Sequence, residues 1–223
     1  MRQTVLHAIR QHRLVAIVRG IPEAALPDTL EALYAGGIRL VEITFRADKS
    51  RSDRDTAGDI ALAVDRFAGR LLVGAGTVLT VQQAELAASA GAGFVLSPNT
   101  DPAVIDRTRA LGLVSVPGAL TPTEVQAADA AGGDIIKLFP AASLGSGYLA
   151  ALRGPLPQLN IMAVGGITPD NMAEYFAAGA GSVGIGSNLV NRARVAARDF
   201  DGIRTLAAHY AARAKGGSHV LAH

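Results

Sequence analysis

Eight short apolar segments recur along this chain of 223 residues, and their repetition constrains the fold more than any other feature. Each segment is followed by residues typical of turns and then by an amphipathic stretch rich in Ala and Leu. Strands that alternate with helices predict βαβ units and a parallel sheet. The predicted strands are residues 14–18, 39–43, 71–73, 94–96, 113–116, 135–139, 161–164 and 182–185.

Eight such units predict an α/β fold of the (β/α)8 barrel type, because an open sheet of eight strands would be unusually wide. An open doubly wound sheet is the alternative. We expect a single domain over residues 1–223, with the barrel at about 14–205 and a frayed tail from about 214 to 223. The charged stretch at residues 48–59 is expected to be a surface loop or a lid over the site.

The composition excludes several classes of function. The chain has no cysteine, which removes disulfides, thiolate metal sites and thiol catalysis. No histidine lies between residues 13 and 208, which argues against a Ser-His-Asp triad or a histidine metal site in the body of the chain. The net charge of +2, the 4% aromatic content and the lack of a long apolar run predict a cytoplasmic protein that binds neither nucleic acid nor membrane.

A lysine within the sixth predicted strand is the most informative charged residue. Lys137 has large apolar neighbours on both sides, and the chain contains only three lysines. Strand alternation places it on the face of Ile135 and Phe139, which would point into the barrel. Burial favours the neutral amine, which is the form that attacks a carbonyl to give a Schiff base. A structural lysine paired with a carboxylate is the alternative.

The second predicted strand presents polar groups with a period of two. Glu42, Thr44 and Arg46 share one face, and in a barrel that face must turn inward because the apolar face meets the helices. Glu42 is therefore a candidate general acid and base, and Arg46 is a candidate for binding a carboxylate with two hydrogen bonds. An ion pair between Glu42 and Lys137 without catalysis is the alternative.

Glycine-rich turns follow the third, seventh and eighth predicted strands. Turns after strands seven and eight usually bind phosphate in barrels, through backbone amides and a helix N-terminus. The Gly-x-Gly at residues 74–76 lacks the third glycine of the dinucleotide fingerprint, so we expect no nicotinamide cofactor. Arg19 ends the first strand and is either a phosphate contact or a surface arginine. The candidate phosphate-binding residues are Gly165, Gly166, Gly186, Ser187 and Arg19.

Five motifs, taken in order, resemble a known family. Residues 42–46 (EITFR), 74–77 (GAGT), 97–99 (SPN), 137–140 (KLFP) and 165–166 (GG) resemble the class I aldolases that cleave 2-keto-3-deoxy-6-phosphogluconate, its galactonate epimer or 4-hydroxy-2-oxoglutarate. The resemblance covers about residues 14–190. It implies a (β/α)8 barrel, a homotrimer, no cofactor and no metal. It also implies that a phosphorylated keto sugar acid is cleaved to pyruvate and D-glyceraldehyde 3-phosphate.

The resemblance assigns roles to individual residues. Lys137 would be the Schiff-base lysine and Glu42 the acid and base. Val164 stands where gluconate-type members usually carry threonine, so the chain resembles the galactonate type better there, and the C4 epimer stays open. The residues that would bind substrate are Arg46, Gly76, Thr77, Pro98, Phe139 and Val164.

Two other functions remain open from the sequence. One is a different phosphate-binding barrel enzyme, an isomerase or synthase, in which Lys137 makes only charge contacts. The other is a catalytically silent barrel that binds sugar phosphates or a protein partner.

Overall fold

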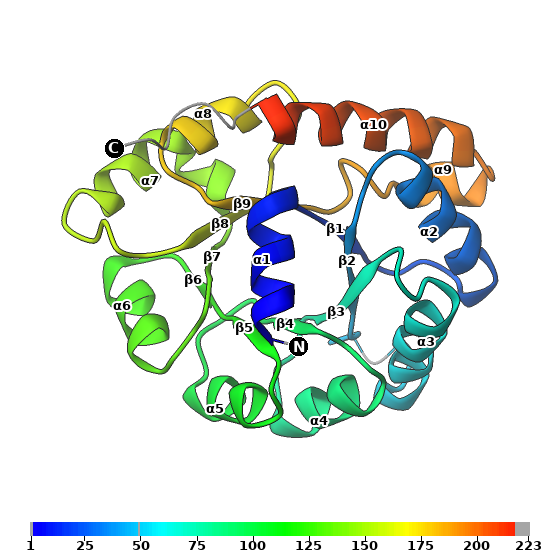
Figure 1. Ribbon diagram of the computed structural model, residues 1–223, viewed down its shortest axis with the longest axis horizontal. Coiled ribbons are helices and arrows are strands. Elements are labelled where there is room, and N and C mark those ends of the chain that lie inside the picture. The colour runs from blue at the N-terminus through cyan, green and yellow to red at the C-terminus, as the bar shows by residue number, and fades with distance from the viewer. Residues whose placement is uncertain (1, 49, 217–223) are drawn as a thin grey trace.

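The computed structural model describes residues 2–48 and 50–216, which form a barrel of parallel strands surrounded by helices (Figure 1). All the strand pairs are parallel, as the βαβ rhythm predicts. The strands are β1 (Leu14–Val18), β2 (Leu40–Thr44), β3 (Leu72–Gly76), β4 (Phe94–Leu96), β5 (Val114–Val116), β6 (Gly118–Ala119), β7 (Ile136–Leu138), β8 (Ile161–Val164) and β9 (Ser182–Ile185).

Nine strand segments occupy the eight positions of the barrel. Their order is β5-β4-β3-β2-β1-β9-β8-β7-β6, and β5 and β6 are separated only by Pro117. On one side of this broken strand, Ser97 N donates to Val116 O at 3.1 Å; on the other, Lys137 N donates to Pro117 O at 2.8 Å. The two halves therefore act as one strand that closes the barrel, which confirms the predicted fold class.

Helices cover the outside of the barrel in chain order (Figure 1). Their ends follow local rules: in α6, Thr121 and Glu124 form the reciprocal capping box that their spacing predicts. The helices are α2 (Leu26–Ala35), α3 (Asp53–Arg66), α4 (Val81–Ser89), α5 (Pro102–Ala110), α6 (Pro122–Ala130), α7 (Gly145–Arg153), α8 (Met172–Ala177), α9 (Arg192–Ala196) and α10 (Phe200–Gly216), with 3-10 turns η1 (Glu23–Ala25) and η2 (Ala141–Ser143).

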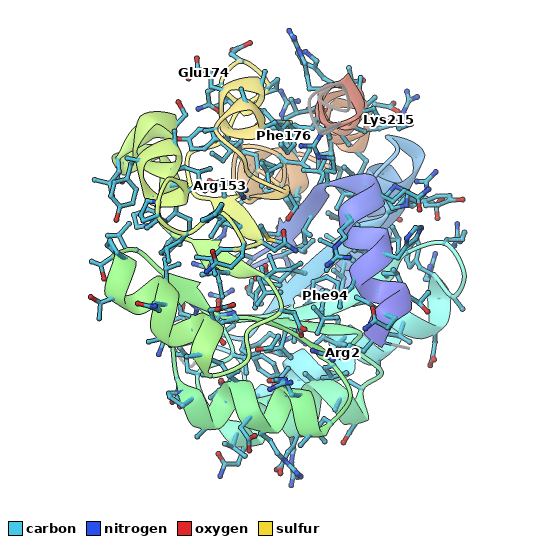
Figure 2. The ribbon with its side chains drawn as sticks, turned by 60° about the vertical axis from the view of Figure 1, so that its left-hand side comes forward. Arg2, Phe94, Arg153, Glu174, Phe176 and Lys215 are labelled. Carbon is cyan, nitrogen blue, oxygen red and sulfur yellow. The ribbon has the colours of Figure 1, made fainter. Side chains whose placement is uncertain are left out.

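The core has two layers that follow the strand alternation. Outward-facing strand residues such as Val41 and Ile136 pack in the cluster beneath the helices. Inward-facing residues such as Leu40, Ile135 and Phe94 (labelled in Figure 2) form a second cluster inside the barrel. The alternation places Glu42 and Lys137 on the inner face, as predicted for both strands.

A helix that we did not predict closes the amino-terminal end of the barrel. In α1 (Arg2–His12), Val5, Leu6 and Ile9 are buried and join the cluster inside the barrel. Arg2, labelled in Figure 2, pairs with Asp134 just before β7. The apolar residues at i, i+1 and i+4 are the signal of one helical face, but they stand in an otherwise polar segment.

The charged stretch 48–59 is only in part the predicted loop: residues 48 and 50–52 form a turn and loop, whereas residues 53–59 are the first residues of a helix. Ser52 Oγ accepts a hydrogen bond from Asp55 N at 3.1 Å, and the Asp55 side chain accepts one from Ser52 N at 3.2 Å. This capping box starts α3 at Asp53, and the acidic residues of the first turn favour the positive end of the helix dipole. The Ser-x-x-Asp spacing of Ser52 and Asp55 is the sequence signal for this helix start.

The predicted fraying from residue 214 is wrong for its first part. Helix α10 continues to Gly216, and Ala214 is buried in the core. Residues 217–223 lie outside the described residues. Within the described residues, no helix combines the length and apolar character needed to cross a membrane.

Candidate active site

A cavity of about 640 Å³ opens at the carboxyl ends of the barrel strands. This is the end at which (β/α)8 enzymes hold their catalytic groups. All but two of the predicted site residues line it. They are Arg19, Glu42, Thr77, Pro98, Lys137, Phe139, Val164, Gly165, Gly166, Gly186 and Ser187.

Lys137 lies in β7 and projects into this cavity from the inner face of the barrel. Its side chain is 4% exposed, and its Nζ lies 5.1 Å from the centre of the Phe139 ring. Burial lowers the pKa of Lys137, although the nearby charge of Glu42 acts in the opposite direction. The lowered pKa makes the neutral, nucleophilic form of this amine easier to populate than that of a surface lysine.

Glu42 lies in β2 and is 1% exposed. Burial raises its pKa against the opposing charges of Lys137 and, less strongly, Arg19. Among the described residues, nothing forms a hydrogen bond with its Oε2. A buried carboxylate oxygen without a partner is costly, so this atom is ready to take up a proton or bind a hydroxyl.

Gly76 does not line the cavity, but it makes room for Glu42. A Cβ built on Gly76 would overlap Oε1 and Cδ of the Glu42 side chain. The pairing of Thr44 with Gly76 in the β2–β3 register brings the two strands to this close approach. The second glycine of the GAGT motif, Gly76, is thus required because the Glu42 carboxylate on the neighbouring strand occupies the space of a Cβ.

Because Glu42 is the predicted acid and base, Gly76→Ala is expected to lower turnover about as much as removal of the Glu42 carboxylate, although the carboxylate is still present. The added methyl group must displace Glu42 from its position, and a misplaced catalytic group commonly costs about 10²-fold in rate. Steady-state kinetics measures the loss. Gly58→Ala is the matched control, because nothing lies within 4 Å of its Cβ position in α3 and alanine favours the helix. Full activity in Gly76→Ala would contradict this packing argument.

Thr77 and Arg19 meet at the rim of the cavity. Arg19 Nη2 donates to Thr77 Oγ1 at 2.9 Å. Thr77 has a φ of 55°, in the left-handed region that a β-branched residue rarely adopts. Such strain concentrates at functional sites, where surrounding contacts maintain it.

Arg46 is the second predicted site residue that does not line the cavity, and it lies beside it. Its Nη2 forms an ion pair with Asp48 Oδ2 at 3.0 Å, and it borders a small recess shared with Gly20 and Thr44. Its assignment to the substrate carboxylate stays a prediction. Strand alternation predicts that Arg46 shares the inner face of Glu42. The ion pair with Asp48 instead holds the guanidinium group beside the cavity.

The two glycine-rich loops after β8 and β9 lie together, as predicted. Gly165 and Gly166 have φ values of 95° and 77°, which glycine adopts without steric cost, and both residues line the cavity. Asn188 Nδ2 donates to Ile167 O at 3.0 Å and ties the two loops to each other. The cavity wall also contains three residues that were not predicted, although they follow closely on the predicted eighth strand: Asn188, Asn191 and Arg192.

A second cavity, of about 680 Å³, lies at the amino-terminal end of the barrel. Arg13 and Arg153 line it, but they donate to the backbone carbonyls of Gly181 (3.2 Å) and Gly179 (2.9 Å). Arg13 also stacks on Phe176, which Figure 2 labels together with Arg153. These arginines are engaged in contacts that hold chain segments together. We therefore place the candidate active site in the first cavity. The described residues contain no cluster of acidic and histidine side chains that could hold a metal ion.

The closed barrel, the buried lysine and carboxylate, and the paired glycine loops define a (β/α)8 barrel with a candidate active site at the carboxyl ends of its strands. Comparison with known proteins identifies the family. A family model described as KDPG and KHG aldolase matches residues 5–206, and the chain belongs to this family.

Individual relatives agree with this assignment. The chain is 41% identical over 177 residues to a probable 2-dehydro-3-deoxy-6-phosphogalactonate aldolase of Rhizobium meliloti, covering 79% of this chain and 81% of the relative. It is 35% identical over 205 residues to a 2-dehydro-3-deoxy-phosphogluconate aldolase of Treponema pallidum, covering 91% and 94%.

A solved structure from Legionella pneumophila is also similar. It is a KDPG aldolase with pyruvate captured at low pH as a covalent carbinolamine intermediate. It matches this structure with a TM-score of 0.81 and 27% identity, over 90% of this chain and 95% of that one.

Proposed function

We propose that this protein is a Schiff-base aldolase that cleaves a 2-keto-3-deoxy-6-phospho sugar acid to pyruvate and D-glyceraldehyde 3-phosphate. The observation that carries the proposal is the burial of Lys137 and Glu42 on the inner face of one barrel, each a charged neighbour of the other. The covalent pyruvate adduct of the Legionella relative supports the same chemistry.

The cleavage needs one nucleophile and one proton carrier. The neutral Nζ of Lys137 attacks the C2 ketone, and the carbinolamine loses water to give an iminium ion. Glu42 accepts the proton of the C4 hydroxyl while the C3–C4 bond breaks, and the bonding electrons pass into the iminium to form an enamine. The aldehyde leaves, C3 is protonated, and hydrolysis of the resulting iminium releases pyruvate and restores the lysine.

The remaining site residues are proposed to bind the two ends of the substrate. Thr77 and Arg46 would hold the carboxylate. The backbone amides of the two glycine loops and the Ser187 hydroxyl would hold the phosphate. Pro98 and Phe139 would form the walls between them. The resemblance to the aldolase family also supports a homotrimer.

We propose the galactonate epimer as the preferred substrate. Val164 is 4% exposed and lies in the cavity wall, where gluconate-type members carry a hydroxyl. A pocket without that hydroxyl cannot bond a C4 hydroxyl turned toward it. The name of the Rhizobium relative supports the same choice.

A comparison of the two epimers tests the proposal. We expect kcat/KM for 2-keto-3-deoxy-6-phosphogalactonate to exceed that for the gluconate epimer, and Val164→Thr to narrow the ratio. A coupled assay for pyruvate release measures both. A higher kcat/KM for the gluconate epimer would contradict the substrate assignment, and turnover of neither would contradict the function.

A further inference from the structure

Three arginines gather at one side of the cavity mouth. Arg19 follows β1, Arg46 follows β2, and Arg192 is the first residue of α9. Arg192 Nε donates to the backbone oxygen of Arg19 at 3.4 Å. Arg19 and Arg192 both line the cavity, whereas Arg46 lies in the adjoining recess.

The partners of these arginines differ. Arg46 has the carboxylate of Asp48, and Arg19 bonds to Thr77. Across the part of the chain that the structure describes, no carboxylate lies within ion-pair distance of Arg192. The following arginines, Arg194 and Arg198, do have such partners, in Asp199 and Asp28.

Arg192 also lies close to another cation. A Cβ on Gly20 would contact the guanidinium groups of both Arg192 and Arg46, the latter at 2.7 Å from its Nη1. The two groups therefore share one small region above Gly20. Like charges at such short range repel each other, and an anionic group bound by either arginine relieves the repulsion.

We propose that Arg192 binds the anionic group at the far end of the substrate and sets the preference for phosphorylated over unphosphorylated keto acids. The inference rests on the proposed function. Arg192 begins α9 five residues after Ser187 and lines the same cavity as the two glycine-rich loops after β8 and β9. A guanidinium group there donates a charge-assisted hydrogen bond to the phosphate, in addition to those donated by the backbone amides of the two glycine-rich loops.

The depth of Lys137 distinguishes the two ends of the substrate. The carboxylate carbon is bonded directly to C2, which must reach the buried Nζ of Lys137. The phosphate at C6 is four carbon–carbon bonds farther out, and Arg192 is exposed at the rim. Arg192 is therefore placed to reach the phosphate end, whereas Arg46, two residues after the strand that carries Glu42, is left for the carboxylate.

The test compares 2-keto-3-deoxy-6-phosphogalactonate with its unphosphorylated analogue in Arg192→Gln. We expect kcat/KM to fall roughly 10- to 100-fold for the phosphorylated substrate, as for loss of a charged hydrogen bond, and to change little for the analogue. Arg192→Lys should recover part of the loss. Arg194→Gln is the matched control, because Arg194 lies on the same helix but pairs with Asp199.

Two outcomes would overturn the inference. An equal loss on both substrates would place Arg192 at the reacting end or in the fold, and no loss on either would show that it makes no contact. Trapping of a pyruvate adduct in the variant separates these results from a failure of the proposed function. If the wild-type protein forms no adduct and cleaves neither substrate, the function fails and the inference falls with it.

Discussion

Lys137→Met is expected to lose turnover by at least about 10³-fold, because methionine fills a similar volume but cannot form an imine. Lys137 is 4% exposed and lines the cavity from the inner face of the barrel, where its amine faces the proposed position of the carbonyl carbon. Pyruvate release from 2-keto-3-deoxy-6-phosphogalactonate measures the loss.

A folded protein is the necessary control for this variant. Methionine removes a buried amine from an apolar environment, and Glu42 can bind a proton once its charged neighbour is gone. We therefore expect the circular dichroism spectrum to be retained. A folded Lys137→Met protein that still cleaves the substrate would rule out the Schiff-base mechanism.

Glu42→Gln is expected to lower kcat by about 10²- to 10⁴-fold, the usual contribution of a general acid and base. The amide keeps the shape of the side chain beside Gly76, but it cannot accept the C4 proton. Lys137 remains, so a borohydride-reducible adduct with pyruvate should still form, although its rate depends on any proton transfer that Glu42 assists.

The pH dependence gives this variant a second readout. Burial raises the pKa of Glu42, so its carboxylate form, and with it the activity, should increase with pH through a range above that of an ordinary glutamate. Glu42→Gln should remove this acid limb from the kcat profile. An unchanged acid limb in the variant would assign the titration to another group and contradict the role of Glu42.

The chemistry-bearing residues were predictable because two simple rules act together. A period of two fixes which side chains share a strand face, and barrel closure forces the polar face of β2 inward with Glu42. The same rules placed Lys137 with Ile135 inside the barrel. The close approach of Gly76 to Glu42 was not predictable, because it depends on the register between two strands.

Other features were missed because their cause lies outside the local pattern. Helix α1 has a short apolar face whose burial depends on the open end of the barrel beneath it. Arg46 shares the face of Glu42 in the sequence pattern, but Asp48 holds its guanidinium group beside the cavity. Arg192 belongs to none of the sequence motifs. Its place at the cavity mouth depends on the path of the chain between β9 and α9, which the local sequence pattern does not predict.

The most direct test of the central claim is borohydride reduction in the presence of pyruvate, followed by intact mass and peptide mapping. We predict one reduced pyruvate adduct, on the peptide that contains Lys137, and none in Lys137→Met. This result would establish the imine and its nucleophile together. A folded wild-type protein that gives no adduct, or an adduct on another lysine instead, would contradict the account.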